Sequence, residues 1–133
     1  MATGFALAYT DEHLPLHLRT GSLAYVREVL LMCNQRPVVF AHSVLPRPGL
    51  RGGWNGITRL GARPLGEALF NNPRIRREAL AYRQIDSRHP LFHAVRRTHA
   101  FSTRVLWARR SVFRLHGHPL LVTEVFLPEI ERR

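Results

Sequence analysis

Two charged residues stand inside apolar stretches that otherwise read as β-strands. Arg27 lies in YVREVLLM, and because side chains alternate between the two faces of a strand it is in phase with Tyr25 and Val29. Glu124 lies in PLLVTEVFLP and shares a face with Val122. A charge buried without a partner is costly, so a strand that keeps one usually pairs it, hydrogen-bonds it or exposes it to a cavity.

The alternation alone leaves two interpretations of these charges open. Arg27 and Glu124 could form a structural salt bridge or stand as rim charges at an edge strand. They could instead line a polar pocket inside the sheet. In such a pocket a guanidinium would bind a ligand carboxylate, and a carboxylate would bind a hydroxyl group or a proton.

Two long hairpins are predicted to position these residues. Asn34 and Gln35 stand where the first hairpin must reverse, and Pro46 ends its second strand. Gly117, in the connection HGHP, can supply the positive backbone angle of the second turn. The hairpins pair residues 23–32 with 36–46 and residues 106–115 with 119–128.

The remaining elements complete an α+β pattern of strands with a helical middle. We expect a strand at residues 5–10, a glycine-rich loop at 48–61 anchored by Trp54, a short helix at 64–72, a strand at 79–85 and a helix at 89–99.

Composition predicts one globular domain in the cytoplasm. A chain of 133 residues, 45% hydrophobic and 22% charged, is long enough for a single core. The single cysteine, Cys33, excludes an internal disulfide and suits a reducing compartment. No leader pattern opens the chain, and no apolar run approaches the roughly 18 residues of a membrane span.

The histidines do not suggest a metal site. His89 and His93 are four residues apart, and His116 and His118 flank a turn, but no carboxylate stands at an accompanying ligand position. Cys33 has no basic neighbour that would activate it, so we expect an inert thiol.

The net charge of +11 favours a small anionic ligand over nucleic acid. All 20 basic residues are arginines, scattered along the chain without a run of five. Guanidinium groups bind carboxylates in bidentate geometry. A specific nucleic-acid role is therefore not the expectation.

Four blocks in this order resemble chorismate pyruvate-lyase, the bacterial enzyme that splits chorismate into 4-hydroxybenzoate and pyruvate. The blocks are VREVLL, RPLGEALF, LWARRSVFRL and PLLVTEVFLP. The resemblance implies one antiparallel sheet of about six strands with helices packed on it and an internal ligand cavity. It also implies a single domain over residues 1–133 that lacks the family's usual N-terminal helical extension. That departure puts catalysis in question.

The resemblance implies roles for three residues. Arg27 and the backbone amide of Leu65 would hold the ring carboxylate, and Glu124 would meet the hydroxyl end, as catalytic or orienting group. Glu28 would then be structural or lie at the surface. Arg109 and Arg110 could face the second carboxylate of chorismate or could be solvated. No metal or cofactor is implied, and the product could feed ubiquinone synthesis or a related aromatic pathway.

Two other functional classes remain as alternatives to the lyase. Effector-binding domains of some bacterial transcription regulators are similar to this fold, which would make the chain a non-catalytic sensor of small aromatic acids. A basic interaction domain for RNA or acidic partners is the third class. A monomer is the expected oligomeric state.

Overall fold

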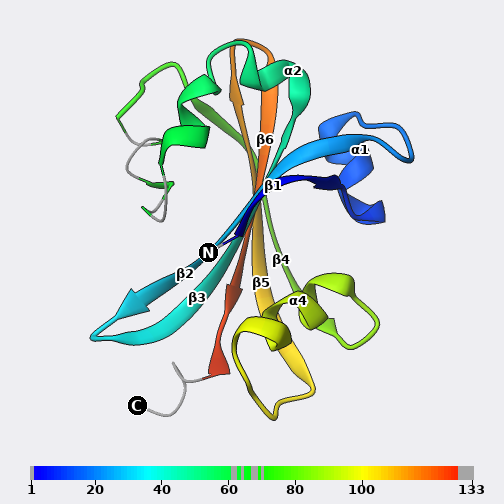
Figure 1. The fold of residues 1–133 in the computed structure, drawn as a ribbon, viewed down its shortest axis with the longest axis vertical. Helices are drawn as coiled ribbons and strands as arrows, with labels where there is room; N and C mark the ends of the chain where they lie inside the picture. Colours follow the sequence, from blue (N-terminus) through cyan, green and yellow to red (C-terminus); the bar gives the residue numbers. More distant parts are fainter. Residues whose placement is uncertain (1, 61–62, 64, 67–68, 70, 129–133) are drawn as a thin grey trace.

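The chain is built around one antiparallel sheet of six strands (Figure 1), in a computed structural model that describes residues 2–60, 63, 65–66, 69 and 71–128. The strands lie in the order β1-β2-β3-β6-β5-β4. This architecture confirms the α+β fold expected from the sequence. The strands are β1 (Ala2–Leu7), β2 (Leu23–Cys33), β3 (Arg36–Pro46), β4 (Arg76–Asp86), β5 (Val105–Leu115) and β6 (His118–Phe126).

Both predicted hairpins are confirmed, and the second strand of one hairpin pairs with the second strand of the other. The turn between β2 and β3 consists of Asn34 and Gln35, with φ of 52° and 65°, and the turn between β5 and β6 consists of His116 and Gly117, with φ of 51° and 81°. Two-residue turns with both φ positive match the right-handed twist of the strands. Pairing of β3 with β6 then joins the hairpins into one sheet.

The predicted strand at residues 5–10 is wrong in its bounds, because β1 ends at Leu7. The backbone amide of Tyr9 donates to Oε1 of Glu12 at 2.8 Å, which starts the 3-10 helix η1 (Thr10–Glu12) instead of continuing the sheet. A side-chain acceptor three residues ahead competes with strand pairing for this amide.

The other expected elements are found with small changes in their ends. The strand predicted at 79–85 is the middle of β4, and the helix predicted at 89–99 is α4 (Pro90–Thr98). Of the helix predicted at 64–72, residues 64, 67–68 and 70 lie outside the described residues. Within it, the amide of Leu69 donates to the carbonyl oxygen of Leu65 at 3.1 Å, which is one helical turn.

Helical segments cover both faces of the sheet, which we name the Arg27 face and the His42 face. On the His42 face, η1, α1 (His13–Leu16) and α4 cover the sheet and bury side chains such as Phe40 and Val44 (Figure 1). On the Arg27 face, α2 (Arg47–Leu50) and the 3-10 helix η2 (Asn55–Arg59) pack over one end of the sheet. Among the described residues, no helix has the length and apolar character needed to cross a membrane.

Trp54 anchors the loop on the Arg27 face, as predicted. Its side chain is 3% exposed, and its indole Nε1 donates to the backbone oxygen of His118 at 2.9 Å. The buried tryptophan thereby ties the segment from α2 to η2 to the start of β6. This loop covers only one end of the sheet, so the rest of the Arg27 face is available for a site.

Candidate functional site

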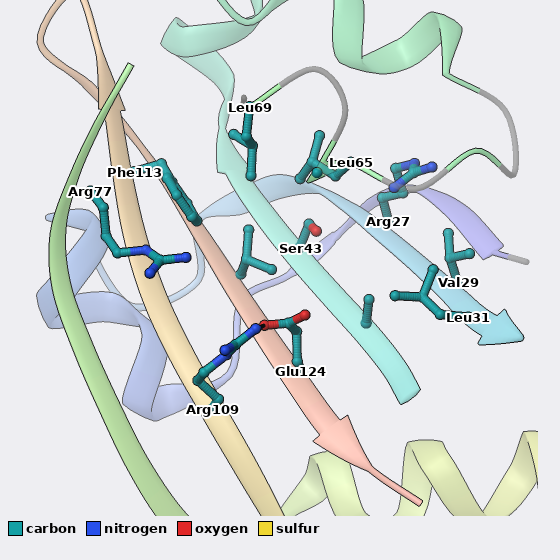
Figure 2. Close-up of a pocket in the computed structure, with 13 residues that line it drawn as sticks. Arg27, Val29, Leu31, Ser43, Leu65, Leu69, Arg77, Arg109, Phe113 and Glu124 are labelled. Atoms are coloured by element: carbon teal, nitrogen blue, oxygen red, sulfur yellow. Dashed lines mark hydrogen bonds and ion pairs between the residues drawn. The ribbon is translucent and has the colours of Figure 1, made fainter. Parts of the chain in front are cut away.

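A cavity of about 180 Å³ opens on the Arg27 face of the sheet (Figure 2). The part of its wall that the structure describes combines apolar side chains with three guanidinium groups and one carboxylate. The described residues that line it are Arg27, Val29, Leu31, Ala41, Ser43, Leu65, Gly66, Leu69, Arg77, Arg109, Phe113, Val122 and Glu124. The cavity therefore includes all three residues that the sequence singled out.

Strand register brings Arg27 and Glu124 to the same face, although almost a hundred residues separate them. Arg27 on β2 lies opposite Ser43 on β3, and Ala41 on β3 lies opposite Glu124 on β6. Side chains two residues apart on β3 share a face. The two charges therefore reach one cavity from strands that are separated only by β3.

Arg27 is a buried cation, with 2% of its surface exposed. Its Nη2 donates to the backbone oxygen of Arg63, in the segment that leads to Leu65. Burial lowers the pKa of Arg27 from its ordinary value, because a low-dielectric site disfavours the charged form. This contact holds the guanidinium at the end of the cavity where Leu65 lies.

Leu65 closes the cavity from above the sheet. Its side chain is 7% exposed and packs in a core cluster with Tyr25 and Phe113. Leu65 accepts the hydrogen bond of the helical turn that ends at Leu69, so it stands at the beginning of that turn. Backbone amides at the beginning of a helical turn have no acceptor within it.

Glu124 is paired with Arg109, a pairing that was not predicted from the sequence. Nε and Nη2 of Arg109 donate to Oε1 of Glu124 at 2.8 and 2.5 Å, across neighbouring strands. Hydrogen bonding to Glu124 and the negative charge of its carboxylate raise the pKa of Arg109 above its ordinary value. Figure 2 shows the second oxygen of Glu124 on the side away from Arg109, which leaves it toward the cavity.

The two adjacent arginines of β5 point to opposite faces. Arg109 lines the cavity, whereas Arg110 donates from Nη1 to the backbone oxygen of Asp11 at 3.1 Å on the His42 face. Of the two arginines that could face the second carboxylate of chorismate, Arg110 therefore lies outside the cavity. Alternation of side chains along a strand requires this separation.

Arg77 lines the cavity, although no feature of the sequence pointed to it. It lies opposite Phe113, and a register shift between Arg77 and Ala79 brings Leu80 opposite Ser111. The shift is a β-bulge, which re-aims side chains and is common beside functional sites. No periodicity in the sequence marks it.

Glu28 is structural, as expected, and belongs to a buried polar cluster on the His42 face. Nδ1 of His42 lies 2.7 Å from Oε2 of Glu28, and Nε2 lies 2.8 Å from Oε2 of Glu12. Burial alone would lower the pKa of His42, but the hydrogen bonds and charges of the two carboxylates raise it to about 9. The cluster ties η1 to β2 and β3 directly behind the cavity.

The other histidines make local contacts. Nε2 of His89 lies 2.7 Å from Oδ2 of Asp11, and Nε2 of His93 lies 2.6 Å from the backbone oxygen of Ser87. Within the described ranges, no group of three or more His, Cys, Asp or Glu side chains is placed to hold a metal ion. Cys33 is exposed at the end of β2.

Solved structures with this fold include domains of transcription regulators. The C-terminal domain of PhnF superposes with a TM-score of 0.73 at 11% identity, covering 97% of this chain and 80% of that one. A GntR-family transcriptional regulator from Bacillus cereus superposes with a TM-score of 0.63 at 14% identity, covering 97% and 89%. At these identities the likeness shows the fold alone.

Sequence relatives are much closer. A "Probable chorismate pyruvate-lyase" from Thiobacillus denitrificans is 60% identical over 127 residues, covering 96% of this chain and 68% of that protein. A protein of the same name from Nitrosomonas europaea is 49% identical over 127 residues, covering 96% and 71%. The chain thus spans about two thirds of the length of these relatives. The family profile described as chorismate lyase matches residues 1–133, and the chain belongs to the chorismate lyase family.

Proposed function

We propose that this chain eliminates pyruvate from chorismate and releases 4-hydroxybenzoate, as a carbon-oxygen lyase. One observation carries the proposal: Arg27, Leu65 and Glu124, from three separate blocks of sequence, line a single cavity. The names of the close relatives support the same activity. Residues 1–133 would act as one domain around the single sheet, and the product would supply ubiquinone synthesis or a related aromatic pathway.

The ring carboxylate of the substrate is held at the end of the cavity formed by Arg27 and Leu65. The guanidinium supplies a charge-assisted fork for the two carboxylate oxygens. The amide of Leu65 supplies a backbone donor, because it begins a helical turn.

Glu124 accepts a hydrogen bond from the ring hydroxyl at the other end of the cavity. Both donors of Arg109 go to Oε1, so the second oxygen of Glu124 is the one that meets the substrate. Arg109 acts as a positioning residue, since its two hydrogen bonds hold Oε1 of Glu124 on the side of β5. The cavity therefore distinguishes the carboxylate end of the ring from its hydroxyl end.

The reaction is an elimination that is balanced without any co-reactant. The ether bond between the ring and the enolpyruvyl oxygen breaks, and the ring carbon that bears the hydroxyl loses its hydrogen. The enolpyruvyl methylene gains one hydrogen and becomes the methyl group of pyruvate, while the ring becomes aromatic. Because aromatisation drives this step, the protein's main contributions are orientation and exclusion of water by walls such as Val29, Val122 and Phe113.

Release of pyruvate from chorismate, coupled to lactate dehydrogenase, tests this function. Arg27→Gln and Glu124→Gln should each lower kcat/KM by about 100-fold or more, since each removes a charged contact to the substrate. The matched controls are Arg36→Gln and Glu78→Gln, which change exposed residues outside the cavity and should leave turnover unchanged.

Titration with 4-hydroxybenzoate in a calorimeter separates the alternatives. Binding that Arg27→Gln abolishes, without any turnover of chorismate by the parent chain, would replace the lyase with a sensor of aromatic acids. Absence of both binding and turnover would reject the ligand cavity as well.

A further inference from the structure

One guanidinium group of the cavity is not used by the proposed contacts with 4-hydroxybenzoate, which is a monoanion. Three guanidinium groups line the cavity, from Arg27, Arg77 and Arg109, against the single carboxylate of Glu124 among the described residues. Arg109 is engaged with Glu124 through two hydrogen bonds. Arg27 is assigned to the ring carboxylate in the proposed function, so Arg77 is left for the second carboxylate of chorismate, which 4-hydroxybenzoate lacks.

Arg77 is brought to the cavity by an irregularity of β4. The register shift between Arg77 and Ala79 adds one residue to this edge strand, so that Arg77 and Leu80 lie opposite Phe113 and Ser111. Figure 2 shows the side chain of Arg77 extending from β4 across β5 toward the middle of the sheet. A regular ladder would not place these two residues, three apart, on the same face.

The Arg77 guanidinium is supported without using its donors. Its central carbon lies 5.2 Å from the centroid of the Phe113 ring, in a cation–π contact. A cation–π contact does not occupy the N–H donors of the guanidinium, so they stay available for a ligand. Within the described part of the chain, no carboxylate forms an ion pair with Arg77. A planar cation held in this way can form a fork with a ligand carboxylate.

We propose that Arg77 binds the enolpyruvyl carboxylate of chorismate, the one that leaves as pyruvate. This inference rests on the proposed lyase function and extends it to the second anionic group of the substrate. Arg27 and Arg77 stand on β2 and on the edge strand β4, at opposite sides of the cavity. One cation thus holds the part that becomes the aromatic product, and the other holds the part that departs.

This division has a consequence for product release. Once the ether bond breaks, Arg77 holds only pyruvate, and 4-hydroxybenzoate keeps its contacts with Arg27, Leu65 and Glu124. Substrate and product then share the contacts with Arg27, Leu65 and Glu124, and the contact with Arg77 is specific to the substrate. The affinity for chorismate should depend on Arg77, and the affinity for 4-hydroxybenzoate should not.

Comparison of substrate and product binding in Arg77→Gln tests the proposal. KM for chorismate should rise about 10- to 100-fold, which corresponds to the loss of hydrogen bonds between charged groups. The dissociation constant of 4-hydroxybenzoate, measured by calorimetry, should stay within about twofold. Arg77→Lys should recover part of the affinity for chorismate, because it restores the charge without the planar fork.

Arg76→Gln is the matched control, because the two variants lose the same charge at neighbouring positions. Arg76 is exposed and lies opposite Arg114, outside the cavity. The KM of Arg76→Gln for chorismate should equal that of the parent chain. A similar rise in both variants would indicate a general effect of net charge and would overturn the proposal.

Two further results would also overturn it. One is an unchanged KM for chorismate in Arg77→Gln, and the other is an equal loss of affinity for chorismate and 4-hydroxybenzoate, as expected if Arg77 only shapes the cavity. If the parent chain does not release pyruvate, the lyase function fails, and calorimetric binding of chorismate replaces KM in the same comparison. A parent chain that binds neither compound would reject both proposals.

Discussion

Nε of Arg109 donates to Oε1 of Glu124 at 2.8 Å, across the β5–β6 hairpin. The two residues are directly opposite each other in the antiparallel ladder. Side chains of such a pair are neighbours on one face of the sheet. Because Glu124 lines the cavity, the hydrogen bond decides which of its two oxygens faces a ligand.

Loss of this contact should affect catalysis. We expect Arg109→Gln to lower kcat/KM for chorismate by about 10- to 100-fold, because Glu124 loses the partner that orients it. In a double-mutant cycle with Glu124→Gln, the two losses should not add, since both remove the same arrangement. Pyruvate release measures the effect, and Arg36→Gln at an exposed position serves as the control. Additive losses would show that Arg109 acts independently of Glu124.

The His42 cluster predicts that the chain is less stable at alkaline pH. His42 has its pKa raised from 6.5 to about 9, so its contribution to stability is complete below about pH 6.5 and is lost as the pH rises through about 9. The free energy of unfolding should fall over this window, by about 3 kcal/mol at most. Urea unfolding followed by tryptophan fluorescence, at a series of pH values, measures it.

The variant His42→Gln isolates this effect from other groups that titrate at alkaline pH. It should be less stable than the parent at neutral pH, because Glu12 and Glu28 lose a cationic partner. Its stability should change less between neutral and alkaline pH. Parallel curves for parent and variant would show that His42 is not the titrating group.

Gly53 is predicted to accept no side chain. A Cβ built there would lie 2.5 Å from Cδ2 and 2.7 Å from Cγ of Leu115, which is 2% exposed. Gly53→Ala should therefore lower the free energy of unfolding by about 1–3 kcal/mol. Gly56→Ala is the control, since no atom lies within 4 Å of its Cβ, and it should change stability by less than about 0.5 kcal/mol. Equal effects of the two changes on Tm would contradict the packing argument.

The first hairpin turn offers a stabilising substitution. Gln35 has a φ of 65°, a left-handed conformation in which its Cβ is strained. Gln35→Gly should raise the free energy of unfolding by about 1 kcal/mol, because glycine adopts this angle freely. The same replacement of Gln84, inside β4, should instead destabilise the chain. A lower Tm for Gln35→Gly would show that the side chain makes a stabilising contact in the turn.

Much of the fold was determined by local sequence. Apolar alternation predicted both hairpins, and Asn34, Gln35 and Gly117 marked their turns at the observed positions. The two-residue turn at His116 and Gly117 also sets the register of β5 on β6, so the Arg109–Glu124 pair was within reach of the sequence. Turn length and register are coupled within a hairpin because its strands are joined directly.

The composition of the cavity was decided by the tertiary structure. The pairing of β3 with β6 brings Arg27 near Glu124, and this long-range pairing has no signature in the periodicity of either strand. The bulge that turns Arg77 toward the cavity and the contact of Glu12 with His42, thirty residues away, depend on packing around the finished sheet. The sequence by itself determined which strands carry charges. Only the folded sheet decided which charges meet, because neighbours across non-consecutive strands are selected by the packing of the whole core.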